Sequence, residues 1–137
     1  RRPGSNPRRS AVPSQGKAMG LNISHGCWQG SYSAFGQWRR AIAHAIGIDL
    51  KAMDGFGGDT LWSALPPDPL HVLLNHPDDS GEIAAEHCPL LFQRLHDIYP
   101  LLPLEPEHNT RSVRARTKKF MRGLRRAIRK NEMLRFC

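Results

Sequence analysis

Long apolar runs are absent from this 137-residue sequence: no stretch approaches the roughly 18 residues that a membrane-spanning helix needs. The basic start is followed by no apolar segment of the kind that marks a secretory signal peptide. Cysteine is scarce too, and Cys27, Cys88 and Cys137 form an odd set without a shared spacing. This pattern argues against a disulfide framework and favours a reducing compartment. We therefore expect a cytoplasmic protein with no membrane partner.

Acidic residues are missing from the first third of the chain. Residues 1–48 carry seven Lys and Arg and no Asp or Glu, residues 49–107 carry eleven acids against two bases, and residues 108–137 carry eleven bases against one acid. Charges sorted in this way repel within a block and attract between blocks. Either the basic ends fold onto the acidic middle or they bind an external polyanion, and the sequence leaves both open.

Residues 1–18 lack apolar periodicity and are rich in Pro, Gly, Ser and Arg. Such a segment cannot offset its ordering entropy by burial. We expect a disordered basic tail, either a natural arm or vector-derived sequence, with Met19 as a native start. Residues 19–137 are long enough to form a single globular domain with its own core.

Three amphipathic helices are predicted from apolar residues at helical spacing. The first follows a capping Ser31 or Ser33 and ends near Gly47. Its stripe comprises Phe35, Trp38, Ile42, Ala45 and Ile46. Three polar residues of this helix, Arg39, Arg40 and His44, fall off the stripe.

The second predicted helix starts near Cys88 and is ended by Pro100, with a stripe of Leu91, Leu95, Ile98 and Tyr99. The third is capped by Asn109 or Thr110. Its apolar face comprises Val113, Thr117, Phe120, Leu124, Ala127 and Ile128. Gly123 within it would allow close packing against a neighbour.

Short strands are predicted at Leu21–Ile23, Leu70–Leu74, Glu82-Ile83 and Met133–Phe136. The apolar run at Leu70–Leu74 is assigned to a buried strand because it is short for a helix. Together the segments predict an α+β fold, with about three amphipathic helices and a few short strands in one domain.

The densest set of potential metal ligands is Asp68, His71, His76, Asp78, Asp79 and Glu82, and its centre is His71, His76, Asp78 and Asp79. Imidazole and carboxylate suit Zn, Mn or non-haem Fe, and a metal with an open position would activate water. The spacing matches no named motif, however, and Asp, Ser and Gly also build ordinary turns. A metal- or small-ligand-binding enzyme centred on these residues is therefore the alternative function. A divalent metal would be its cofactor, and otherwise no cofactor is favoured.

The segment Ser24-His25-Gly26-Cys27 contains a thiol and an imidazole, which could serve as nucleophile and base. Neighbouring strand residues point apart, which places the imidazole poorly for proton transfer. A buried structural cysteine is the favoured interpretation.

A basic row runs along the third predicted helix at steps of four, four, three and four: Arg114, Lys118, Arg122, Arg125 and Arg129. Bases at this density neutralise phosphates without reading sequence. The competing interpretation is that these charges are solvated or paired with the acidic block. The leading function is a non-enzymatic binding module for an acidic partner, either nucleic acid or a protein surface.

Two strings carry a family resemblance: Gly20-Leu21-Asn22-Ile23-Ser24-His25-Gly26-Cys27-Trp28, and Asp68-Pro69-Leu70-His71 through Leu74-Asn75-His76 to Gly81-Glu82-Ile83. They resemble an uncharacterised family of small hypothetical proteins from bacterial and phage genomes. The resemblance spans about Met19 to Phe136 and implies a phage-associated context, but no mechanism. In that family the turn reads H-S-D-x-D-G, whereas one of the acids is replaced here by Ser80. This departure weakens the metal interpretation.

Overall fold

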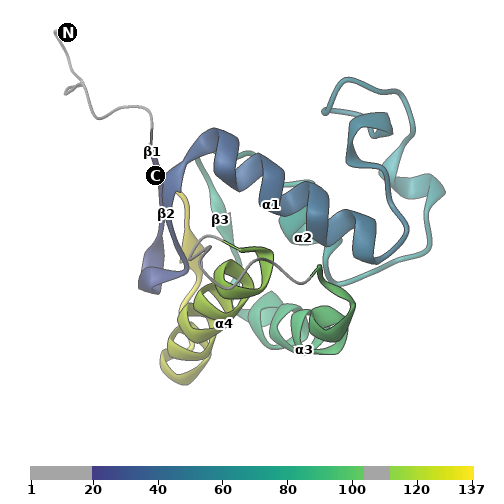
Figure 1. Ribbon diagram of the computed structural model, residues 1–137. Coiled ribbons are helices and arrows are strands. Elements are labelled where there is room, and N and C mark those ends of the chain that lie inside the picture. The colour runs from purple at the N-terminus through teal and green to yellow at the C-terminus, as the bar shows by residue number, and fades with distance from the viewer. Residues whose placement is uncertain (1–19, 104–111) are drawn as a thin grey trace, which may run out of the picture.

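The computed structural model describes residues 20–103 and 112–137. Within these ranges the chain forms four α-helices and four short strands, which confirms the predicted α+β class (Figure 1). The predicted tail, residues 1–18, and the predicted caps Asn109 and Thr110 lie outside the described residues. Among the described helices, none combines the length and the apolar character that crossing a bilayer requires.

The strands form two antiparallel pairs. β1 (Gly20–Ile23) pairs with β2 (Trp28–Ser31), and β3 (Glu82–Ile83) pairs with β4 (Leu134–Arg135). The strand predicted at Leu21–Ile23 is thus part of a hairpin, whose second strand the sequence did not indicate.

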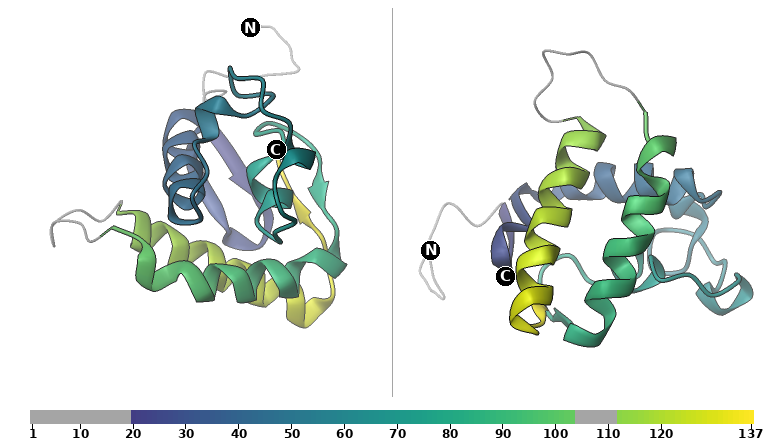
Figure 2. Two further views of the ribbon diagram at one scale, coloured as in Figure 1. Left: turned by 90° about the vertical axis from the view of Figure 1, so that its right-hand side faces the viewer. Right: turned by 90° about the horizontal axis from the view of Figure 1, so that it is seen from below.

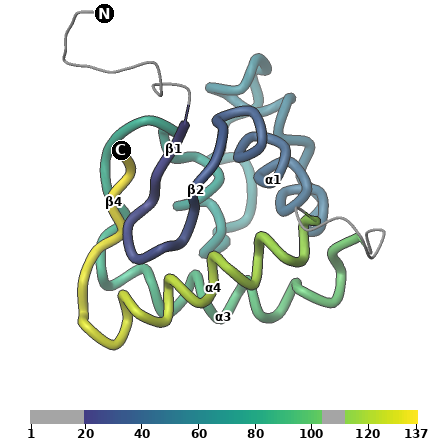
Figure 3. The backbone as a smooth tube through the Cα atoms, turned by 60° about the vertical axis from the view of Figure 1, so that its left-hand side comes forward, coloured from purple at the N-terminus to yellow at the C-terminus, as the bar shows by residue number. Residues whose placement is uncertain are grey.

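The two strand pairs are joined through the end of the chain. Ile23 forms an isolated bridge with Phe136, and the backbones of Asn22 and Cys137 exchange hydrogen bonds of 3.1 and 2.9 Å. The segment after β4 therefore runs beside β1, as the backbone tube shows (Figure 3). Residues from both ends of the described chain build one layer.

Helix α1 (Tyr32–Ala45) begins and ends where the sequence predicted. Ser31 Oγ accepts a hydrogen bond from the Ala34 amide at 3.1 Å, which caps the helix. After the helix, Gly47 adopts a φ of +80°, a conformation that favours glycine. On the inner face, Trp38 Nε1 donates to Thr117 Oγ1 at 2.9 Å, so even the polar atom of this buried indole is satisfied.

Helices α3 (Cys88–Ile98) and α4 (Val113–Lys130) lie side by side and antiparallel in one layer, with α1 and the strands against it (Figure 2). Ser112, rather than the predicted Asn109 or Thr110, caps α4, because its Oγ accepts from the Ala115 amide at 3.0 Å. The predicted stripe of α4 is confirmed at Thr117, Phe120, Leu124 and Ala127, which are fully buried.

Gly123 allows α4 to approach the β1–β2 turn closely. A Cβ at this position would lie 2.5 Å from Cys27 Sγ and 2.7 Å from the Cys27 amide nitrogen. Any larger residue would push the helix away from the turn, so the predicted close packing is confirmed.

The strand predicted at Leu70–Leu74 is wrong: residues His71–Leu74 form the one-turn helix α2. Asp68 starts this turn, because its Oδ1 accepts from the Leu70 amide at 2.9 Å. Leu70, Leu73 and Leu74 are all fully buried, a helical spacing that a run of five residues is too short to distinguish from a strand.

Candidate functional site

Helix α4 carries a row of cations on its outer surface. Its exposed bases, here called the α4 row, are Lys118, Lys119, Arg122, Arg125, Arg126, Arg129 and Lys130. Of the five predicted polyanion-binding residues, the structure therefore places four, Lys118, Arg122, Arg125 and Arg129, in solvent on this surface. None of these four has an ion-pair partner among the residues that the structure describes.

Arg114, the fifth predicted residue, binds backbone carbonyls of its own chain instead of facing solvent. It is half-buried, and its Nε and Nη2 donate to the Leu102 carbonyl at 3.2 and 3.1 Å. Nη2 also donates to the Pro100 carbonyl at 3.2 Å, and the guanidinium carbon lies 5.2 Å from the centre of the Tyr99 ring. Arg114 thus ties the start of α4 to the segment that follows α3.

Two of the exposed cations lie near aromatic side chains of α3 and of the segment that follows it. Lys118 Nζ lies 5.6 Å from the centre of the Tyr99 ring, and the Arg125 guanidinium lies 5.4 Å from the centre of the Phe92 ring. Such contacts are weak at exposed sites, but they orient the long side chains. They leave the charge of both groups available to an external anion.

The predicted metal ligands are not brought together. Within the described ranges, no three His, Cys, Asp or Glu residues form a group that could hold a metal ion. The His71 ring packs edge-on against Trp62, with 5.2 Å between ring centres, and Asp79 Oδ1 accepts from Ser80 Oγ at 3.2 Å.

His76 is held by its own neighbourhood. Its Nδ1 and Nε2 lie 2.7 and 3.0 Å from the carbonyl oxygens of Pro77 and Glu82. Its ring stacks on Phe136, with 4.1 Å between ring centres. In the neutral ring, the nitrogen that carries the proton donates to one of these carbonyls and helps to hold the turn in place.

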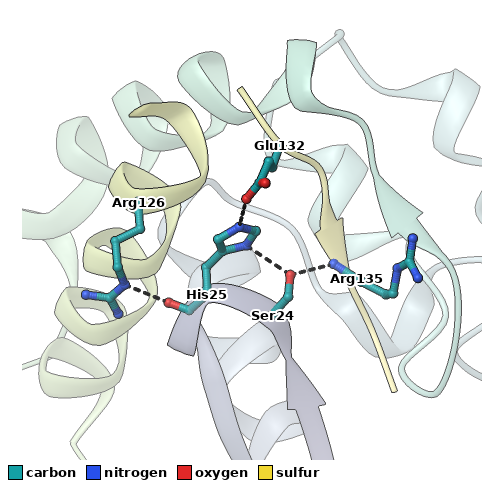
Figure 4. Close-up of polar contacts among 5 residues, drawn as sticks. All are labelled: Ser24, His25, Arg126, Glu132 and Arg135. Atoms are coloured by element: carbon teal, nitrogen blue, oxygen red, sulfur yellow. Dashed lines mark hydrogen bonds and ion pairs between the residues drawn. The ribbon is translucent and has the colours of Figure 1, made fainter. Parts of the chain in front are cut away.

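A polar network surrounds the β1–β2 turn (Figure 4). His25 Nε2 donates to Glu132 Oε1 at 2.8 Å, which leaves Nδ1 to accept from Ser24 Oγ at 3.1 Å. Ser24 Oγ itself accepts from the Arg135 amide at 2.9 Å, and Arg126 Nε donates to the His25 carbonyl at 2.9 Å.

Hydroxyl, imidazole and carboxylate follow one another in this network in the order of a catalytic triad. The Ser24 hydroxyl, however, already serves as acceptor for the backbone of β4, and His25 has a φ of +63°, a strained value for a residue with a side chain. The network fixes this strained turn to α4 and β4.

Cys27 is a buried structural cysteine. It is fully buried, and burial raises the pKa of its thiol to about 12, so the nucleophilic thiolate is not formed near neutral pH. Both nitrogens of His25 are directed to Ser24 and Glu132. The thiol–imidazole pair considered from the sequence is therefore not assembled.

Sequence reasoning missed Arg39. It falls off the apolar stripe of α1, yet its side chain is only 4% exposed. It lines a cleft of about 440 Å³, to which His76 and Asp78 also contribute. Arg39 is buried because the loop around Phe56 and the turn after α2 cover it. Both segments are distant in sequence, so a local pattern in α1 could not predict this burial.

Comparisons with protein-family models, with curated proteins and with solved structures find no match to this chain.

Proposed function

We propose that this protein is a non-enzymatic binding module that holds a nucleic-acid phosphate backbone on the outer surface of α4. One observation carries the proposal: seven exposed cations occupy one helix, and Lys118, Arg122, Arg125 and Arg129 have no acidic partner among the described residues. The proposed membership of a bacterial and phage protein family adds a genomic context but no activity.

The chemistry of the row suits phosphates in particular. Lys118 to Arg129 span about 16 Å along the axis, because an α-helix rises about 1.5 Å per residue. A DNA duplex carries about one phosphate charge for every 1.7 Å of its own axis, so several phosphates lie within reach of the row. Binding would release condensed counterions and would carry no information about base sequence.

The test is a binding titration at rising salt with short fluorescent duplexes and single strands of unrelated sequence. If four phosphates are neutralised, the logarithm of the association constant for a duplex should fall against the logarithm of salt with a slope of about −3.6. The variant Lys118→Glu/Arg122→Glu should weaken binding to all sequences alike.

The matched control is Lys51→Glu/Arg135→Glu, which changes net charge equally at two exposed positions outside α4. It should bind nearly as tightly as the unaltered protein. Equal losses in both variants would mean that overall charge, not the α4 row, drives binding. Undetectable nucleic-acid binding at low salt would overturn the proposal in favour of an acidic protein surface as partner.

A further inference from the structure

Arg39 is a buried cation in an apolar setting. Its guanidinium carbon lies 4.7 Å from the centre of the Phe35 ring and 5.2 Å from that of Phe56, and its side chain is 4% exposed. Removing such a charge from water is unfavourable unless hydrogen bonds and an opposite charge compensate it. The contacts around this guanidinium supply only part of that compensation.

One nitrogen of the guanidinium is well satisfied. Nη1 donates to the Leu73 and Leu74 carbonyls at 3.2 Å each and to the His76 carbonyl at 2.6 Å. These bonds fasten the end of α2 and the following turn to α1. They use neither of the other two nitrogens.

The remaining donors lack partners among the described residues. Nε is buried without a hydrogen bond, and Nη2 has none to any described residue, although it is not sealed from solvent. Among the described residues no carboxylate lies within ion-pair distance of Arg39. Burial lowers the pKa of the guanidinium, and the more distant Asp78 carboxylate offsets part of that effect.

The cleft beside Arg39 has the dimensions of a ligand site. Its volume of about 440 Å³ falls within the roughly 300–1,000 Å³ typical of small-molecule pockets. Its wall joins the apolar ring of Phe56 to the amide of Asn75 and to a second cation, the exposed Arg40. Asp78 is the one acid among the lining residues, so the lining is cationic on balance.

The fold holds this wall in place. The Phe56 amide donates to the Met53 carbonyl at 3.0 Å, and Gly55 and Gly57 flank Phe56 with φ values of +91° and +102°. The Phe56 ring packs edge-on against Trp62, with 6.2 Å between ring centres. The loop is therefore wound tightly enough to keep an aromatic ring over the guanidinium.

We infer that this cleft binds a small ligand through an oxyanion, a carboxylate or phosphate group that pairs with Nη2 of Arg39 beside Arg40, while the apolar part of the ligand packs against Phe56. A guanidinium N–H forms a charge-assisted hydrogen bond with either anion. This inference does not depend on the α4 row, since no residue of α4 lines the cleft.

Four probes test it by titration, read from backbone amide chemical shifts: inorganic phosphate, phenyl phosphate, benzoate and neutral benzamide. The three anions should bind saturably and shift the amides of Gly36, Gly55 and Asn75, whereas benzamide should not. The relative affinities of benzoate and phenyl phosphate distinguish a carboxylate from a phosphate ligand. Phenyl phosphate should bind more tightly than inorganic phosphate because of the Phe56 contact.

Variants locate the site. Arg39→Gln should weaken anion binding at least about tenfold, because a hydrogen bond to a charged group is lost. Asp78→Asn should strengthen it by about two- to fivefold, since a like charge at the cleft is removed, and Arg40→Gln should weaken it by a similar factor. Lys118→Glu/Arg122→Glu should leave it unchanged.

The Asp78 and Arg40 variants decide the matter even if Arg39→Gln fails to fold, because neither side chain makes a hydrogen bond to any described residue. If both bind the anions as the unaltered protein does, the cleft is not the site and Arg39 serves only to fasten the turn after α2. The same conclusion follows if no anion saturates, or if the α4 variant abolishes binding.

Discussion

Arginine occupies two opposite environments in this molecule. The bases of the α4 row are exposed to solvent and lack acidic partners among the described residues. Arg39, in contrast, lies between two aromatic rings and donates to three carbonyls. Exposed charges contribute little to folding, while a buried one is tied to the backbone that it satisfies. We therefore expect the many exposed charges of α4 to contribute less to folding stability than the single buried Arg39.

The apolar side of α4 provides the reference for this comparison and the largest expected effect. Phe120 is fully buried, and its ring centre lies 4.9 Å from that of Trp38. Phe120→Ala should lower the free energy of unfolding by about 3–5 kcal/mol in denaturant titrations. A nearly neutral result would show that the two faces of α4 do not differ as described.

Arg39→Ala comes next, with an expected loss of about 1–3 kcal/mol, because the carbonyls of Leu73, Leu74 and His76 lose their donor. The matched control is the neighbouring exposed residue. Arg40→Ala should change stability by no more than about 0.5 kcal/mol in the same unfolding measurement. If the two variants proved equally mild, the contrast between buried and exposed arginine would be lost.

Charge reversal on the α4 row should have a smaller and opposite effect. Lys118→Glu/Arg122→Glu exchanges one like-charge pair, 118/122, for another, but it turns the repulsive i, i+4 pairs 114/118 and 122/126 into attractive ones, each worth about 0.2–0.5 kcal/mol. The melting temperature should stay level or rise slightly. A clear fall would indicate that these bases pair with the acidic middle of the chain, the arrangement that would leave no free row for a polyanion.

The smallest effect is expected at Glu132, an exposed charge that does have a partner. Its hydrogen bond from His25 lowers the pKa of its carboxyl group. A carboxyl whose pKa is lower in the folded state stabilises above its unfolded pKa of about 4.3, and this contribution disappears as the pH falls through the folded value. The melting temperature of Glu132→Gln should therefore lie slightly below that of the unaltered protein at neutral pH and meet it in acid. A constant difference down to acidic pH would exclude this linkage.

The sequence predicted those parts of the fold that rest on local patterns. Apolar periodicity located α1, α3 and α4, because each helix buries one face along its whole length, and a predicted serine cap gave the start of α1. The same reasoning failed at α2, where a single turn is too short for a period to appear. The contacts that hold this turn come from outside the run: Asp68 Oδ1 accepts from the Leu70 amide, and Arg39 donates to the carbonyls of Leu73 and Leu74.

The candidate sites divide in the same way. The basic row of α4 could be predicted from spacing alone, except that Arg114, one of the five predicted residues, fastens the segment after α3 instead. Arg39 and the His25 network could not, because their partners lie far away along the chain. His25 and Glu132, for example, are 107 residues apart. Contacts of this kind leave no periodic trace in a sequence.

The pairing of β1 with the segment after β4 has a consequence for synthesis on the ribosome. Asn22 exchanges backbone hydrogen bonds with Cys137, a residue 115 positions later. The hairpin of β1 and β2 thus emerges more than 100 residues before its partner, and one edge has no neighbour until residues 134–137 have been made. Pairing at such separation slows folding, and an open edge meanwhile invites contact with other chains. The nascent protein should therefore complete its sheet only after residues 134–137 have been made, and truncation before Leu134 should leave it prone to aggregate.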